Sequence, residues 1–200
     1  MDMKKLMLIL AISIFSISST TFALPYKAQE FAVASPSPYS ASVANEIAKS
    51  GGNLFDQTVG VALALAVTHP YYASLGGGGF TIIRKNNPGA APTVEVLDFR
   101  ETAPMASSRE SFIGKGDKAA TDGGMASGVP GVPAGLQEMH RKYGKVAWRK
   151  LFSPAIRLAE QGFPVSGEWA EQTKAEFENF TTNGKKTFGR VVLDKSKPPR

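Results

Sequence analysis

The stretch "FTIIRKNNPGAAPTVEVLDFRETAP", from Phe80 to Pro104, predicts a β-hairpin with an arginine at the end of its second strand. Two segments rich in β-formers flank a turn rich in Asn, Pro and Gly, which is a typical hairpin pattern. Successive residues of a strand point to opposite faces. One face is expected to carry Val94, Val96, Asp98 and Arg100, and the other Glu95, Leu97 and Phe99.

Arg100 is the candidate binding residue of this hairpin. Its guanidinium offers a planar fork of donors that matches a carboxylate, and it stays charged at every physiological pH. It can therefore bind and orient an anion, but it cannot act as a general base. Asp98 and Glu101 are close in sequence, so an internal ion pair with one of them is the structural alternative. The residues alone leave both interpretations open.

Four consecutive glycines, Gly76–Gly79, precede the hairpin. Such a run lets backbone approach backbone or ligand closely and presents bare N–H groups. A phosphate cradle is not indicated, because neither the Lys-Ser/Thr pair of a P-loop nor the spaced dinucleotide fingerprint is present. A tight turn into the strand, beneath a bulky group, is the alternative.

Helical patterns lie on both sides of the hairpin. On the N-terminal side, a short apolar strand is expected from Phe31, broken by Pro36 and Pro38. A helix with Val43 and Ile47 follows and ends at Gly51 and Gly52, and a buried helix capped by Asn53 or Asp56 runs through Val67.

On the C-terminal side, a loop region from Met105 to Met125 precedes a corner from Gly128 to Pro133. A helix then carries Leu136 and Met139 and ends at Gly144. Ser153 is expected to cap a helix that ends at Gly162, and Ser166 a helix through Phe180. From Thr181 the chain turns polar, and no element is assigned there.

The composition excludes several classes of chemistry. The 200 residues contain no cysteine, which rules out disulfides, thiolate catalysis and Cys-based metal sites within them. His69 and His140 are expected to stand alone, without the neighbouring carboxylates that a metal site would need, so no metal and no cofactor is expected. The basic residues are interspersed with acids rather than gathered into a stripe, and a nucleic-acid partner is not expected.

Residues 1–23 have the pattern of a signal peptide. Lys4 and Lys5 precede an apolar run from Leu6 to Ile17, and small polar residues lead to Ala23. The run is shorter than the roughly 20 apolar residues of a membrane span. We therefore expect an exported chain, periplasmic or secreted, that has no membrane association after cleavage.

Several motifs occur in one order between Phe31 and Ser166. They are "ASPSPYSASVANEIAKSGGNLFDQTVGVALALAVTHP", "LGGGGF", "LDFRETAP", "ASGVPGVPAG", "KYG" and "AIRLAEQGFPVS". Together they resemble the start of the large subunit of the gamma-glutamyltranspeptidases, a family of N-terminal-nucleophile hydrolases. The resemblance implies an α+β fold, the four-layer αββα sandwich of such hydrolases, incomplete in this chain. Residues 24–200 would then be the N-terminal portion of the large subunit.

The same resemblance implies a function. Members of the family are precursors that cut themselves, and the new N-terminal threonine attacks a gamma-glutamyl donor such as glutathione, for transfer or hydrolysis. Arg100 corresponds to the arginine that binds the α-carboxylate of the donor. No catalytic residue is expected within this chain, because the threonine is absent from it. The chain alone would be inactive, with the remainder of the large subunit and the small subunit as its partners.

Other functions remain open at this point. One is a cephalosporin-type acylase or a poly-gamma-glutamate depolymerase of the same family, and another is a non-catalytic exported remnant that binds a glutamyl group. The chain also departs from the family pattern at Leu54 and Gln57, and at Tyr71, Tyr72 and Ala73 before the glycine run. These departures leave Arg100 untouched.

Overall fold

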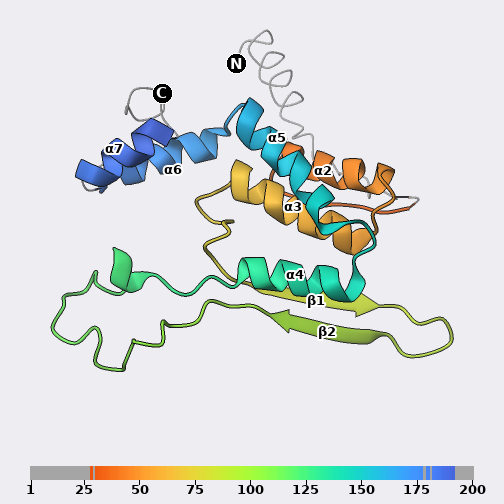
Figure 1. Ribbon diagram of the computed structural model, residues 1–200, viewed down its shortest axis with the longest axis horizontal. Coiled ribbons are helices and arrows are strands. Elements are labelled where there is room, and N and C mark those ends of the chain that lie inside the picture. Colours follow the sequence, from red (N-terminus) through yellow and green to blue (C-terminus); the bar gives the residue numbers. More distant parts are fainter. Residues whose placement is uncertain (1–27, 29, 178, 181, 192–200) are drawn as a thin grey trace, which may run out of the picture. The chain divides into compact units, whose positions relative to one another are not determined.

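The computed structural model describes residues 28, 30–177, 179–180 and 182–191 (Figure 1). The elements described below all belong to one unit of the chain, which begins at Val33. The expected signal peptide, residues 1–23, lies outside the described residues. Within the described part of the chain, no helix is long and apolar enough to cross a membrane.

Two helices, α2 (Pro38–Lys49) and α3 (Leu54–Thr68), begin this unit. Asn53 is the N-cap of α3, and Asp56 completes a capping box by accepting a 2.9 Å hydrogen bond from the Asn53 N–H. Of the two predicted caps, Asn53 is thus the correct one. The strand predicted from Phe31 is wrong: residues 31–35 form no strand, Pro36 lies in a bend, and Pro38 begins helix α2.

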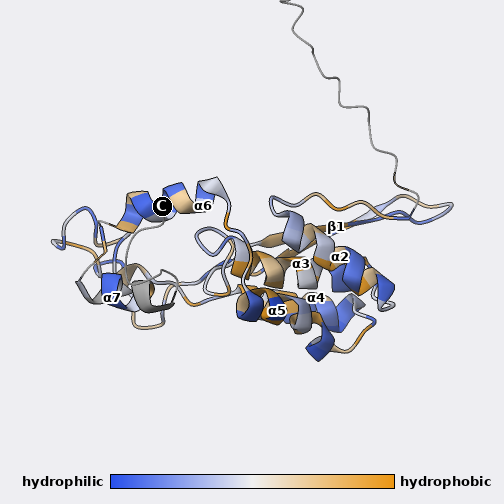
Figure 2. Cartoon of the chain, turned by 90° about the horizontal axis from the view of Figure 1, so that it is seen from above, coloured by the Kyte–Doolittle hydropathy of each residue, from blue (hydrophilic) through white to orange (hydrophobic). Residues whose placement is uncertain are grey.

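The core forms where α2 and α3 pack closely. A methyl group on Gly60 would lie 2.0 Å from Cδ1 of Ile47, so the glycine is what allows these helices to approach. The buried core is completed from helix α4 (Val132–Tyr143), the 3₁₀ helix η2 (Trp148–Phe152) and helix α5 (Ser153–Gln161). Its members are Val43, Ile47, Val59, Leu63, Ala64, Leu136, Met139, Leu151 and Ala155. Figure 2 shows hydrophilic residues along parts of α2, α4 and α5.

The predicted hairpin is confirmed as β1 (Phe80–Lys85) and β2 (Thr93–Asp98), which pair antiparallel as a two-stranded sheet. Phe80 lies opposite Asp98. The predicted faces are also confirmed, since Val94, Val96, Asp98 and Arg100 are exposed and Glu95, Leu97 and Phe99 are partly buried. The strand ends at Asp98, whose side chain accepts a 3.0 Å hydrogen bond from the Arg100 N–H.

Helix α4 (Val132–Tyr143) lies between the hairpin and the helical core (Figure 1). It is followed by the 3₁₀ helix η2 (Trp148–Phe152) and by α5 (Ser153–Gln161). Ser153 is not the cap that was predicted: it is already helical, because η2 runs directly into α5, and its side chain makes no capping bond. Gly162 ends α5 as predicted, with a φ of 74°.

Two further helices, α6 (Gly167–Phe177) and α7 (Thr182–Val191), follow α5. Ser166 caps α6 as predicted, through a 3.1 Å bond from the Trp169 N–H, but the helix ends at Phe177 rather than Phe180. Helix α7 was not predicted, because its polar sequence contains glycines that lower helix propensity.

The predicted loop from Met105 to Met125 contains no strand or α-helix, and the short 3₁₀ helix η1 (Gly124–Ala126) forms at its end. The described residues thus combine α-helices with one small antiparallel sheet, which agrees with the α+β class.

Candidate functional site

Three segments that are distant in sequence meet at the end of strand β2. They are the glycine run, residues 99–102 and the corner that precedes α4. Phe99 and Gly79 exchange two backbone hydrogen bonds, of 3.0 and 3.3 Å, which extend the hairpin ladder by one pair. The N–H groups of Gly131 and Val132 both donate to the carbonyl of Gly77, at 2.9 and 3.0 Å. The glycine run is therefore used as a backbone junction, as in the strand-entry interpretation.

The third connection joins residues 99–102 to the corner before α4. The Val129 N–H donates to the Thr102 carbonyl at 2.8 Å, and the two residues form an isolated antiparallel bridge. Arg100 therefore lies in a short segment that is fixed on one side by the glycine run and on the other by this corner.

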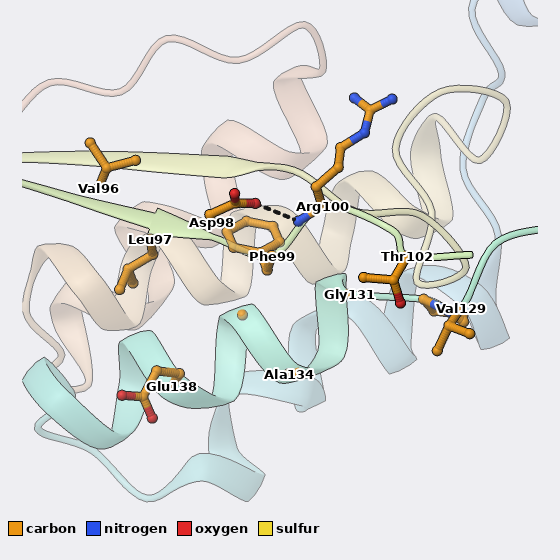
Figure 3. Close-up of a pocket in the computed structure, with 12 residues that line it drawn as sticks. Val96, Leu97, Asp98, Phe99, Arg100, Thr102, Val129, Gly131, Ala134 and Glu138 are labelled. Carbon is orange, nitrogen blue, oxygen red and sulfur yellow. Dashed lines mark hydrogen bonds between the residues drawn. The ribbon is translucent and has the colours of Figure 1, made fainter. Parts of the chain in front are cut away.

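Arg100 points away from helix α4, whereas the ring of Phe99 points toward it (Figure 3). The side chain of Arg100 is 68% exposed, and its Nε lies 3.1 Å from Oε2 of Glu101. Of the two acids considered from sequence, Glu101 is the ion-pair partner, because Asp98 is bonded to the Arg100 backbone instead. The terminal guanidinium nitrogens donate no hydrogen bond to any described residue, so they remain available to an anion.

Glu101 is held as a carboxylate beside this guanidinium. Its own backbone N–H has the largest effect in lowering the pKa of its carboxyl group, and the Gly78 N–H and Arg100 lower it further against the opposing effect of burial. Oε2 accepts no hydrogen bond of regular geometry in the described part of the chain. The ion pair with Arg100 consequently persists below the usual pH range of glutamate titration.

Arg100 lines two cavities. One, of about 440 Å³, lies between the end of β2 and α4, with mostly apolar walls that include Leu97, Val129 and Ala134 (Figure 3). The other, of about 620 Å³, lies between Gly76 and the loop from Thr102 to Gly128, and its wall is more polar. An exposed guanidinium at the edge of two hollows is suited to binding a ligand that carries a carboxylate.

Neither cavity contains a histidine among its lining residues. His69 Nδ1 lies 3.0 Å from the hydroxyl of Thr68. His140 Nε2 lies 2.8 Å from the Val146 carbonyl and 3.7 Å from Oδ1 of Asp56, so the prediction that it has no neighbouring carboxylate is wrong. Asp56 comes from a distant helix, and no sequence pattern indicated this proximity. The arrangement around Arg100 can bind and orient, but it offers no activated nucleophile.

Sequence reasoning missed the glycines of α4 and of the corner before it as part of this site. Gly131 and Gly135 lie against Phe99, where added methyl groups would be 1.8 Å from the Phe99 carbonyl oxygen and 2.2 Å from its ring Cγ. The motif "ASGVPGVPAG" contained a signal, since a glycine inside a helical pattern usually reflects a close approach.

Comparison with known proteins places this arrangement in a family. Residues 40–200 match the family model of gamma-glutamyltranspeptidase. The chain therefore belongs to the gamma-glutamyltranspeptidase family, as the sequence motifs predicted, and corresponds to the N-terminal part of its members.

Individual relatives agree with this assignment. The chain is 38% identical over 185 residues to a glutathione hydrolase proenzyme of Pseudomonas aeruginosa, an alignment that covers 90% of this chain and 31% of the relative. It is 40% identical over 154 residues to a glutathione hydrolase proenzyme of Escherichia coli, covering 75% of this chain and 26% of the relative. The chain thus spans about a third or less of the length of these relatives.

The crystal structure of Helicobacter pylori gamma-glutamyltranspeptidase has a similar fold. It superposes with a TM-score of 0.74 at 36% sequence identity, over 82% of this chain and 48% of that chain. The helices and hairpin described above are therefore arranged as in a member of the family.

Proposed function

We propose that this chain is part of an enzyme that transfers or hydrolyses the gamma-glutamyl group of glutathione and related donors. In this proposal Arg100 binds the α-carboxylate of the donor. The observation that supports it is the position of Arg100, exposed at the edge of two cavities with its terminal nitrogens unbonded to the described residues. The names of the aligned relatives support the same activity.

The proposed role of Arg100 is to bind and orient the donor. A hydrogen bond to a charged group contributes about 1.5–3 kcal/mol, which corresponds to roughly 10- to 150-fold in affinity. Glu101 holds the guanidinium at Nε and leaves the terminal nitrogens directed outward. The nucleophile would be a threonine outside these residues, which removes its proton through its own α-amine. The chain by itself is expected to release no product.

We also propose that the rest of the protein covers the outer face of the hairpin. Four side chains of that face are apolar and well exposed: Phe80 58%, Ile82 73%, Val94 62% and Val96 57%. A contiguous apolar face of this kind usually marks a surface that another element covers. A second sheet packed here would complete the four-layer αββα sandwich. Residues 24–200 would then be the N-terminal portion of the large subunit, and the rest of the large subunit and the small subunit would be its partners.

The alternatives predict different donors. A cephalosporin-type acylase would not depend on an α-carboxylate, whereas a poly-gamma-glutamate depolymerase would prefer polymeric donors. A non-catalytic glutamyl-binding protein would bind glutamate without turnover. An exposed arginine on the cavity edge favours a donor with a free carboxylate. Export to the periplasm or outside the cell, after removal of residues 1–23, is part of the same proposal.

The test compares two donors that differ in one group. Gamma-glutamyl anilide carries the α-carboxylate, and its α-carboxamide analogue lacks the charge. The readout is the acid-to-amide ratio, which is kcat/KM for the acid divided by kcat/KM for the amide. In the complete enzyme that contains this chain, Arg100→Lys is expected to lower this ratio by about 10-fold or more, chiefly through KM. The reason is that lysine lacks the two-pronged hydrogen-bonding geometry of arginine.

Self-cleavage of the precursor should be unchanged in this variant. The matched control is Arg149→Lys, since Arg149 is exposed and lines neither cavity. An unchanged acid-to-amide ratio in Arg100→Lys would remove Arg100 from the binding site.

A further inference from the structure

Phe99, the residue before Arg100, is surrounded by glycines from three segments. An added methyl group would lie 3.1 Å from the Phe99 ring at Gly79, 2.2 Å from it at Gly135, and 1.8 Å from the Phe99 carbonyl oxygen at Gly131. Distances under 3.0 Å leave no room for a side chain of any size. The ring and backbone of Phe99 therefore fill space that these glycines leave open.

The following residue, Glu101, is confined in the same way. A methyl group on Gly78 would lie 2.5 Å from the Glu101 backbone nitrogen, and one on Gly128 would lie 3.0 Å from its Cβ. Both neighbours of Arg100 are thus closely packed against glycines. The side chain of Arg100 itself is not among the atoms that an added methyl group on these glycines would meet.

Backbone conformation does not explain why these positions are glycine. The glycines with positive φ are Gly51, Gly89, Gly114, Gly116, Gly123 and Gly162, and none of them contacts Phe99 or Glu101. The glycines around Phe99 have backbone angles that other residues can adopt. Glycine is required at these positions because a larger side chain would collide with Phe99 or Glu101.

Residues 99 and 100 are consecutive in an extended segment, so their side chains point in opposite directions. Figure 3 shows the Phe99 ring directed toward α4 and the Arg100 guanidinium directed away from it. Because the two residues share this segment, we expect that displacing the Phe99 ring shifts the segment and redirects Arg100. Beyond the ion pair with Glu101, no charged group of the described chain restrains the Arg100 side chain, which is 68% exposed, so its direction depends on the backbone that carries it.

We propose that Phe99 is a positioning residue for donor recognition: seated in the space left by Gly79, Gly131 and Gly135, it fixes the direction in which Arg100 presents its guanidinium. The preference for a donor with a free α-carboxylate then depends on a steric fit at α4, on the side of the strand opposite to the arginine. This inference rests on the proposed function of Arg100 and adds to it a residue whose ring points away from the arginine (Figure 3).

The first test is Gly135→Ala in the complete enzyme, with gamma-glutamyl anilide and its α-carboxamide analogue as donors. The added methyl group displaces the ring, and the acid-to-amide ratio of kcat/KM is expected to fall by about 10-fold, since small displacements of a binding group have large kinetic effects. A general loss of folding would lower both kcat/KM values together and leave their ratio unchanged. Gly167→Ala is the matched control, because a methyl group there meets no atom within 4 Å.

The second test uses a smaller side chain at position 99. Phe99→Ala adds no clash, and it is expected to lower the acid-to-amide ratio on its own because the ring that occupies this space is removed. The double variant Gly135→Ala with Phe99→Ala lacks Cγ and Cδ1, the two atoms nearest to the added methyl group at 2.2 and 2.4 Å, so its ratio is expected to fall no further than that of Phe99→Ala alone. Non-additivity of this kind is the signature of residues in contact.

The outcomes separate the two proposals. If Arg100→Lys leaves the ratio unchanged, the proposed function of Arg100 fails, and this inference fails with it. If Arg100→Lys lowers the ratio but Gly135→Ala and Phe99→Ala both leave it unchanged, Phe99 has no positioning role and the proposed function stands. A lowered ratio in both single variants, with a double variant no lower than Phe99→Ala alone, supports the inference, and a double variant in which the two effects add contradicts it.

Discussion

Arg100 and Glu101 form a contact between neighbours in the sequence: Nε of the arginine lies 3.1 Å from Oε2 of the glutamate. The pair uses one edge of the guanidinium and leaves its far end free. An ion pair that occupied the terminal nitrogens would block an incoming carboxylate, whereas this one restrains the side chain without covering those atoms. The internal ion pair and the ligand-binding role, which the sequence presented as alternatives, are therefore compatible.

Glu101→Gln is expected to raise the KM for the gamma-glutamyl donor by roughly 2- to 5-fold in the complete enzyme, the effect of losing one partly exposed ion pair. Because the pKa of Glu101 is lowered, KM in the unmodified enzyme should stay constant through the usual glutamate range and rise only at lower pH. The variant has no titrating group at this position and should lack that rise. Initial rates across the acid range measure both effects, and identical pH profiles would contradict the assignment.

Asp56→Asn is expected to destabilise the fold by about 2–3 kcal/mol. Asp56 is fully buried and accepts from the Asn53 N–H at 2.9 Å and from the Lys145 N–H at 3.1 Å. An amide would turn an NH₂ group toward one of these donors. Urea unfolding measures the change, with Asp122→Asn in the exposed loop as a control that should stay within about 0.5 kcal/mol of the unmodified chain. Equal midpoints for both variants would argue against a structural role.

Glu95→Gln is expected to reduce stability in a pH-dependent way. The pKa of Glu95 is lowered, mainly by its hydrogen bond with Lys142 at 2.7 Å and then by that with Tyr143. A group whose folded pKa is lowered stabilises the fold above its unfolded pKa, about 4.3, and loses this effect as the pH falls through the folded pKa. The difference in melting temperature should therefore be largest near neutral pH and disappear in acid.

The control for that measurement is Glu110→Gln, because Glu110 is exposed in the loop and lies outside the ion pairs of the described chain. A constant difference between Glu95→Gln and the unmodified chain at every pH would mean that the charge of Glu95 is not the source of the stability.

Elements with local signals were predictable from the sequence. The alternation of Val96 and Leu97 set the faces of the hairpin, and Asn53 and Gly162 marked helix ends through their own side chain or backbone freedom. The placement of Arg100 on the same face as Val96 followed from the same alternation. Each of these features depends on residues within a few positions of one another, so the pattern contains the information.

Features that depend on distant residues could not be predicted. The proximity of His140 to Asp56 requires two helices to pack, and the fit of Phe99 to Gly135 requires α4 to lie under the hairpin. The choice of Glu101 over Asp98 as the partner of Arg100 depends on the backbone N–H group that captures Asp98. Sequence order alone does not determine which of two nearby acids is already engaged.

The junction of the glycine run, residues 99–101 and the corner before α4 also has a consequence for the order of folding. The hairpin turn closes a short loop, whereas the contact of Gly131 with Phe99 closes a much longer one, at a greater entropic cost. A chain that has formed only the hairpin carries its arginine on an unanchored strand end. We infer that the arginine acquires its final direction only when α4 docks, which would make the binding site one of the later parts of the chain to form during folding.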